Sequence, residues 1–144
     1  MASAAFEEIA ETFEFLDDWE DRYRHVIELG KAMPPLAASE RVPATKVDGC
    51  ASQVWLVPEV SGSGAGAVLT FRGESDALIV KGLIAILIAL YSGRTAREIA
   101  ATDASAELGR LNLQDNLSSQ RSNGLKAMVA RVSLLAGQAA AQGA

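Results

Sequence analysis

Hydrophobic residues recur at helical spacing near the start of the chain. In the first segment, every third or fourth position is apolar, at Phe6, Ile9, Ala10, Phe13 and Leu16. This spacing predicts an amphipathic helix that ends near Asp17. Asp18 then has the position of an N-cap for a second helix, which Gly30 and the pair Pro34-Pro35 end. The apolar face of this second helix is predicted at Trp19, Tyr23, Val26 and Ile27.

The pattern changes in the middle of the chain. Residues 35–46 show little periodicity and are predicted to form a loop. The segments "SQVWLVPEV" (52–60) and "AVLTFRG" (67–73) are rich in β-branched and aromatic residues, and the glycines of "SGSGAG" lie between them. This arrangement is typical of an antiparallel β-hairpin.

The second half of the chain has mainly helical signals. Residues 77–91 are almost continuously apolar, with Ser75 or Asp76 as the predicted N-cap and Gly93 at the end. "TARE" (95–98) is a capping box, and residues 103–114 indicate a further short helix and a turn. A last long helix is predicted from a stripe at Leu125, Met128, Val129, Val132, Leu135 and Ala136.

This order of elements predicts an α+β fold in which helices cover one side of a small antiparallel sheet. We expect residues 1–144 to form one domain, with frayed ends at 1–4 and 137–144. The apolar stretch 77–91 has fifteen residues and includes Lys81, whereas a membrane-spanning helix needs about twenty apolar residues. It is therefore predicted to be a buried core helix.

Composition and charge narrow the classes of function. The chain is 49% hydrophobic and 22% charged, as expected of a globular protein, and its net charge is -5. Its thirteen Lys and Arg are scattered, so nucleic acid is not an expected partner. The shortness of the 77–91 stretch likewise leaves no expected membrane partner. One cysteine cannot form an internal disulfide and no secretory signal opens the chain, so a cytoplasmic location is expected.

Three candidate sites have little support from the sequence. "GSGAGA" satisfies a dinucleotide-binding pattern through Gly62, Gly64 and Ala67, but a strand follows it where a helix is required. With one Cys and one His, a zinc or iron-sulfur site is not expected, although carboxylate sites for hard cations stay open. His25 falls off the apolar stripe of its helix and is expected to face solvent, which disfavours a Cys–His dyad.

Cys50 is the candidate of greatest chemical interest. Free cysteines are often buried as small hydrophobes. Here Gly49 permits a tight turn, and polar Asp48, Ser52 and Gln53 surround the thiol, which places it on a loop leading into a strand. The spacing of these residues alone favours a functional role for Cys50 only slightly over a role in core packing.

The longer motifs carry a family resemblance. "DGCASQVWLV", "FRGESDALIVKGLIAILIALYSGRTAREI" and "LSSQRSNGLKAMV", preceded by "WEDRYRHVIELGKAMPPL", occur in that order between about Phe6 and Val132. The chain resembles the SufE family, which includes the CsdE-type sulfur acceptors. The resemblance implies an α+β fold similar to the SufE/IscU-like fold.

The resemblance also implies a function. Such a protein is not an enzyme itself: it accepts persulfide sulfur from a PLP-dependent cysteine desulfurase of the SufS or CsdA type, which it stimulates. It then passes the sulfur to an iron-sulfur assembly scaffold of the SufBCD type. PLP belongs to the partner, so no cofactor is expected on this chain, and a weak homodimer is conceivable. The loop is expected to rest tucked in, walled by Val47, Val54, Trp55 and Leu56, and to swing out on docking.

Specific positions carry the family's motif. Cys50 matches the sulfur acceptor, and Arg121 matches an arginine that supports the cysteine loop. A cation in the first turn of a helix opposes the helix dipole, so we expect Arg121 to have a compensating partner. Gly49, Ser52, Gln53, Trp55 and Asp76 match positions that bind the partner or hold the loop, with helix capping the alternative for Asp76.

Two departures and several rival functions complete the prediction. Asn116 and Ser119 stand where the better-known bacterial pattern often has histidine and proline, which leaves the details near Arg121 and the choice of desulfurase open.

A thiol peroxidase or hydrolase that uses Cys50 would need a base or a second thiol, and a cluster scaffold would need more ligands. A regulatory protein that binds the desulfurase without sulfur transfer is the remaining alternative.

Overall fold

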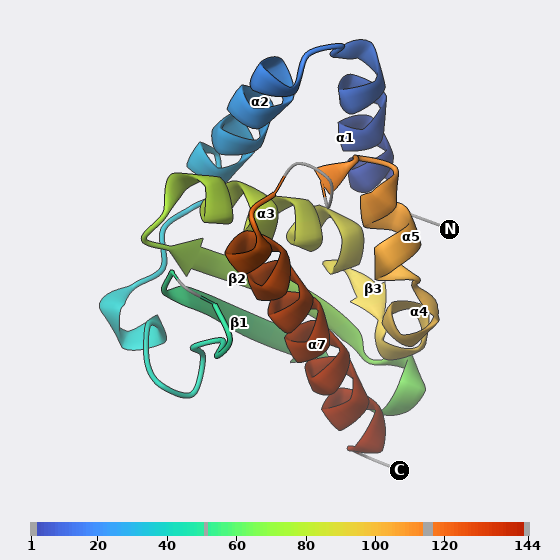
Figure 1. The fold of residues 1–144 in the computed structure, drawn as a ribbon. Coiled ribbons are helices and arrows are strands. Elements are labelled where there is room, and N and C mark those ends of the chain that lie inside the picture. The colour runs from blue at the N-terminus through green and yellow to red at the C-terminus, as the bar shows by residue number, and fades with distance from the viewer. Residues whose placement is uncertain (1–2, 51, 114–116, 143–144) are drawn as a thin grey trace.

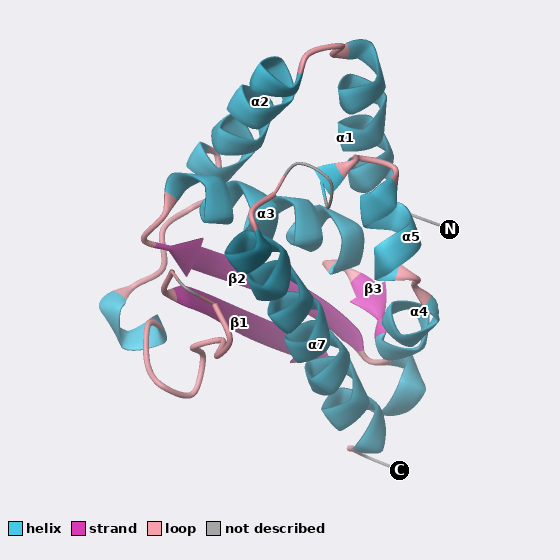
Figure 2. Cartoon of the chain, in the orientation of Figure 1, coloured by secondary structure: helices cyan, strands magenta, loops and turns pink. Residues whose placement is uncertain are grey.

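The computed structural model describes residues 3–50, 52–113 and 117–142, which form a small sheet with helices packed on one of its faces (Figures 1 and 2). The helices are α1 (Ala4–Phe15), α2 (Trp19–Lys31), α3 (Leu78–Tyr91), α4 (Ala96–Ala101), α5 (Ala104–Gly109) and α7 (Ser119–Ala141). The strands are β1 (Val54–Ser61), β2 (Val68–Ser75) and β3 (Arg94–Thr95), with short 3-10 turns η1 (Ala38–Glu40) and η2 (Gly64–Gly66). The predicted α+β class is confirmed.

The sheet is antiparallel, with the strand order β1-β2-β3. β1 and β2 form the predicted hairpin, in a register that pairs Val54 with Ser75 and Ser61 with Val68. Alternate side chains such as Leu56 and Leu69 are buried under the helices, as expected of a sheet with one covered face. The "GSGAGA" motif forms the hairpin turn and is followed by β2, so it lacks the helix that a dinucleotide site requires.

Charged pairs cover the opposite face of the sheet. The carboxylate of Glu40 in η1 pairs with the guanidinium of Arg72 on β2, and Arg41 Nη1 lies 2.9 Å from Glu74 Oε2. These contacts hold the segment after α2 against the hairpin. The loop predicted over residues 35–46 is thus confirmed apart from the single turn of η1.

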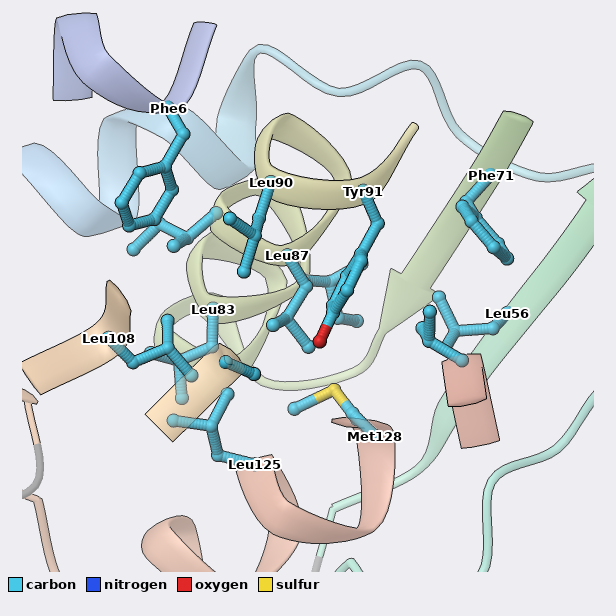
Figure 3. Packing of buried hydrophobic residues seen from close by; sticks show 14 of the residues in the cluster. Phe6, Leu56, Phe71, Leu83, Leu87, Leu90, Tyr91, Leu108, Leu125 and Met128 are labelled. Carbon is cyan, nitrogen blue, oxygen red and sulfur yellow. The ribbon is translucent and has the colours of Figure 1, made fainter. Parts of the chain in front are cut away.

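Helix α3 is the centre of the core, as predicted from its apolar composition. Side chains from α1, β1, β2, α5 and α7 converge on it (Figure 3). α2 approaches closely at two glycines: a Cβ built on Gly82 would lie 2.1 Å from Val26 O, and one on Gly30 would lie 2.6 Å from Gly82 N. In the described part of the chain, no helix has the length and apolarity that crossing a membrane requires.

Two predicted helix starts are confirmed: the Asp18 carboxylate caps α2, and Thr95 and Glu98 form the capping box of α4. Asp103 caps α5, a cap that was not predicted. Gly30 was predicted to end α2 but lies inside it, because the helix continues to Lys31. α1 ends at Phe15, slightly before the predicted Asp17. The predicted cap of α3 is wrong, because the N-cap residue is Ala77, which has no side-chain acceptor.

Both ends of the described chain are helical and make specific contacts, and the fraying expected at residues 1–4 and 137–144 stays a prediction. Ser3 caps α1 through a hydrogen bond from Phe6 N–H. At the other end, α7 continues to Ala141 because Ala136 and Ala139 are buried, and Gln142 O accepts a hydrogen bond of 2.9 Å from Gly64 N–H. The alanine-rich tail therefore packs against the hairpin turn.

Helix α2 packs its predicted apolar face against the core, but the four residues of that face are buried unequally. Val26 and Gly30 are its buried residues, whereas Trp19, Tyr23 and Ile27 are only half-buried. Close contact between the α2 and α3 backbones at the glycines brings a narrow strip of α2 into the core and leaves the aromatic side chains at its edge.

Candidate functional site

The Cys50 loop is closed at its base by backbone pairing. Val47 N–H donates to Val54 O at 2.8 Å, and Leu56 N–H donates to Thr45 O at 2.9 Å. These bonds place Cys50 in a short loop between two fixed stems. Gly49 has a φ of 92°, a left-handed conformation that favours glycine, so its sequence role in a tight turn is confirmed.

Asp76 fixes the outgoing stem of this loop. Its Oδ1 accepts a hydrogen bond of 3.0 Å from the backbone N–H of Gln53. The carboxylate therefore crosses from the end of the hairpin to the Cys50 loop, and the capping alternative for Asp76 is wrong. Ser75 is also not the N-cap of α3, although its Oγ accepts a hydrogen bond from Ala77 N–H.

The loop rests on the first turns of α7. Cys50 Sγ lies 3.6 Å from Gly124 O, and a Cβ built on Gly124 would be only 3.5 Å from the same sulfur. A Cβ on Gly49 would lie 3.2 Å from Ala127 Cβ. Small residues on α7 therefore let the loop and the helix approach closely.

Arg131 of α7 secures the incoming stem. Its Nη2 donates to Ala44 O at 2.9 Å and to Lys46 O at 3.1 Å. Sequence reasoning missed this residue, since an arginine on the polar side of a helix gives no sign that it will reach a loop more than eighty positions earlier. The loop is thus held by Asp76, which follows β2, by Arg131 of α7, and by the backbone bonds at its own base.

Cys50 faces a pocket of about 320 Å³ between its loop, α3 and α7. Val80, Leu83 and Met128 supply the apolar lining, and Figure 3 shows Met128 and Leu83 extending toward each other from α7 and α3. The full lining is Cys50, Ser52, Val80, Leu83, Ser118, Gln120, Arg121, Gly124 and Met128.

The predicted apolar walls were misplaced. Val47, Val54 and Leu56 are buried in the core, and Trp55 is half-buried on β1, where it is bridged to Lys46. None of the four lines the pocket. Residues near a cysteine in sequence point away from it when they alternate along a strand, so the walls come from helices distant in the chain.

The pocket keeps the thiol protonated. Burial raises the pKa of Cys50 above its ordinary value, and the nearby carboxylate of Asp48 raises it further. At neutral pH the resting group is therefore a thiol whose S–H can donate to Gly124 O. Because the thiolate is the nucleophile, the resting geometry protects the sulfur from reaction.

Arg121 lies at the rim of this pocket with its side chain exposed. Its backbone N–H donates to Ser118 Oγ, the N-cap of α7, at 3.3 Å. The expected compensating partner is not found: no ion pair joins its guanidinium to any residue that the structure describes. The positive charge is therefore available to an anion in the pocket.

The remaining predicted residues divide into two groups. Cys50, Ser52 and Arg121 share the pocket, whereas Gly49 and Gln53 shape the loop. Ser119, one of the two departures from the bacterial pattern, is the first residue of α7, and Asn116 lies outside the described residues.

His25 is not near this group. It is half-buried, and its ring packs edge-on against Phe13 of α1 with centroids 5.9 Å apart, so the prediction that it faces solvent is wrong. It does not line the Cys50 pocket. Among residues 3–50, 52–113 and 117–142, no three His, Cys, Asp or Glu side chains gather as a metal site would require.

Fold and site together define a small α+β protein that presents one protonated thiol to a pocket at the start of a long helix. The chain belongs to the SufE family: the family's Fe-S metabolism associated domain matches residues 7–136. This membership connects it with sulfur transfer in iron-sulfur metabolism.

Comparisons with individual proteins agree with this assignment. An uncharacterised SufE-like protein of Rhizobium etli is 57% identical over 129 residues, covering 90% of this chain and 87% of its own. A second, from Rhizobium meliloti, is 51% identical over 128 residues, covering 89% and 91%. The solution structure of a hypothetical protein from Thermus thermophilus has the same fold, with a TM-score of 0.75, 19% identity and coverage of 96% and 98%.

Proposed function

We propose that this protein is a sulfur carrier that accepts persulfide sulfur on Cys50 from a PLP-dependent cysteine desulfurase. It stimulates the desulfurase by removing the sulfur, and passes it to an iron-sulfur assembly scaffold. The observation that carries the proposal is the half-buried Cys50 thiol facing a pocket of about 320 Å³. Family membership supports the choice of sulfur transfer over other thiol chemistry.

The transfer is a thiol exchange without net oxidation or reduction. The Cys50 thiolate attacks the outer sulfur of the donor's persulfide, and a new S–S bond forms as the donor's S–S bond breaks. The donor cysteine leaves as a thiolate, which takes up the proton that Cys50 has lost. Cys50 then carries the persulfide, and delivery repeats the exchange with the recipient as nucleophile.

The raised pKa of Cys50 requires a movement before this attack. Withdrawing the thiol from Gly124 into water, or into the partner's site, removes the desolvation that holds the proton. The bonds from Asp76 and Arg131 to the loop stems set the free energy of that movement. Docking of the desulfurase can favour the open loop by binding it more tightly than the closed one.

The closed pocket suits the loaded state. Apolar Val80, Leu83 and Met128 restrict the access of reductants and oxidants to the outer sulfur. Arg121 at the rim provides positive charge for a persulfide anion, and Ser52 adds a hydroxyl group. A peroxidase or hydrolase has less support, since either enzyme would need a base beside the sulfur, and His25 lies elsewhere.

Mass spectrometry of the intact protein tests the proposal. After incubation with the desulfurase and cysteine under non-reducing conditions, we expect the protein to gain the mass of one sulfur atom on Cys50. Cys50→Ser should gain none and should fail to accelerate sulfide release. Leu134→Ser, at an exposed site on α7, is the matched surface control and should behave as the unaltered chain.

The same assay separates carriage from regulation. If Cys50→Ser stimulates the desulfurase as fully as the unaltered protein, sulfur carriage is wrong and regulatory binding replaces it. If sulfur is gained but cannot be passed to a cluster scaffold, acceptance stands and delivery to cluster assembly fails.

A further inference from the structure

The turn between α1 and α2 exposes an aromatic side chain that the sulfur chemistry does not use. Phe15, the last residue of α1, is 87% exposed. Trp19, the first residue of α2, lies across the turn from it and is half-buried. Figure 1 shows this turn at the top of the molecule, at the end away from the sheet and from α7.

A shallow groove continues from this turn along α2. Its volume is about 530 Å³, and it is lined by Trp19, Glu20, Tyr23, Arg24 and Ile27. Its apolar residues are four positions apart, so they form a strip about 12 Å long on one helix face. We call Phe15 and this groove the tip surface.

The tip surface is fixed in shape before any partner arrives. Arg22 Nε donates to Phe13 O at 3.0 Å and to Leu16 O at 2.9 Å, which ties α2 to the end of α1. The Arg22 guanidinium also lies 5.9 Å from the centre of the Phe13 ring. The backbone on both sides of Phe15 is therefore ordered before binding, which lowers the conformational entropy lost when a partner docks.

The charge around the tip surface indicates which kind of partner can bind there. Residues 1–31 contain nine Asp and Glu against three Lys and Arg, a net charge of −6, whereas residues 32–144 contain nine against ten, or +1. Elsewhere Glu40, Glu74 and Glu107 are paired with arginines. By contrast, four carboxylates around the tip have no ion pair with any described residue, namely Glu11, Glu14, Asp17 and Glu20.

We propose that the tip surface binds a cationic amphipathic helix of a protein partner. The partner's apolar side chains contact Phe15 and the Trp19–Tyr23–Ile27 strip. Its Lys and Arg pair with the four carboxylates named above and stack on the aromatic rings. A second copy of this chain is disfavoured as the occupant, because two tips of the same negative charge would repel each other. No residue of the tip surface lines the Cys50 pocket, so binding there leaves the thiol loop free to move.

The test uses the full chain and a synthetic helical peptide in which leucines at i and i+4 are flanked by lysines. Titration of the isotope-labelled protein should shift NMR signals at Phe15, Trp19, Tyr23 and Ile27. Replacing the leucines by serine, or the lysines by glutamate, should abolish binding. These peptides separate apolar docking from attraction by charge alone.

Matched variants show which residues contribute to the affinity for the peptide. Phe15→Ser and Glu14→Lys should each weaken binding by about tenfold. Leu134→Ser, with 55% exposure on α7, and Glu59→Lys, at an exposed site on β1, are the apolar and charge controls and should change it by less than about twofold. Circular dichroism verifies that each variant is folded.

Two results would overturn the proposal. One is peptide binding that shifts signals on α7 or the sheet and is indifferent to Phe15→Ser, since the tip would then not be the site. The other is a concentration-dependent dimer that Phe15→Ser abolishes, since a second copy would then occupy the surface. Neither result depends on sulfur transfer, which the Cys50 assay measures separately.

Discussion

Removal of the Asp76 carboxylate should release the Cys50 loop without unfolding the protein. Asp76→Ala deletes the acceptor that lies 3.0 Å from Gln53 N–H and leaves the exposed N–H to water. A charge-assisted hydrogen bond to an exposed carboxylate is worth about 1 kcal/mol, at the low end of its class. Loop opening should therefore become about fivefold more favourable.

Alkylation of the thiol reports this opening. Iodoacetamide reacts with the thiolate, which the pocket disfavours, so the rate depends on the population of open loop. We expect Asp76→Ala to react about fivefold faster, and Asp76→Asn, which keeps a neutral acceptor, to lie between it and the unaltered chain. Rates measured against pH separate a change of opening from a change of the pKa of Cys50.

The controls make this reasoning refutable. Asp48 is the carboxylate whose charge raises the pKa of Cys50. Removing a distant carboxylate should therefore leave the alkylation rate unchanged, unlike Asp76→Ala. Glu59→Ala removes an exposed carboxylate from β1, with no bond to the loop. If both variants accelerate alkylation equally, or if Asp76→Ala leaves the rate unchanged, the Asp76 contact does not restrain the loop.

Substitutions at the Cys50 loop and at the contact between α2 and α3 should have opposite kinds of effect, on reactivity and on stability. Because the pKa of Cys50 is raised, its alkylation should reach half-maximum above the pH of an ordinary thiol, and Asp48→Asn should lower that midpoint. Arg131→Met should also increase alkylation, because it removes two bonds to the incoming stem of the loop. Gly82→Ala should destabilise the fold by about 2–4 kcal/mol in denaturant titration, whereas Gly137→Ala, in open space on α7, should stabilise it by up to about 1 kcal/mol.

Linkage extends the pH prediction to stability. The folded state holds the Cys50 proton more tightly than the unfolded chain, because the folded pKa is raised. As pH rises above the unfolded pKa, the unfolded state loses its proton first, so the free energy of unfolding falls until the folded pKa is passed. Cys50→Ser should reduce this alkaline loss, which denaturant titration between neutral and alkaline pH measures; burial also raises the pKa of Tyr91, so the part of the loss that Tyr91 contributes should persist.

Local sequence signals predicted the secondary-structure elements better than they predicted the contacts between those elements. The hairpin, the capping box at Thr95 and the central helix followed from patterns contained within each segment. The apolar face of α2 was predicted correctly, but its uneven burial was not, because Gly30 and Gly82 bring two backbones together and no pattern within α2 reveals this. The tail after Ala136 lacked a strong hydrophobic stripe, yet docking on the hairpin keeps it helical.

The functional site shows the same difference between local signals, which could be read from the sequence, and long-range contacts, which could not. Cys50 and its glycine could be found from sequence, and the family motif added Arg121 and Asp76. The roles could not be found, because they depend on partners distant in the chain: Asp76 bonds across to Gln53, and Arg121 has no partner among the described residues. Gly124 and Arg131 gave no signal, since a glycine and an arginine within a helix have many structural uses.

Protection and reactivity make opposite demands on a sulfur carrier, and the proposed function requires both. Burial beside Gly124 raises the pKa of Cys50 and keeps the resting sulfur unreactive, so transfer needs an open state. If the loop were fixed only by the core, opening would cost part of the fold. Instead, peripheral bonds from Asp76 and Arg131 hold its stems, and these can break while α3 stays packed. The free energy of opening can thus be set independently of the free energy of folding, which is what a partner-triggered thiol requires.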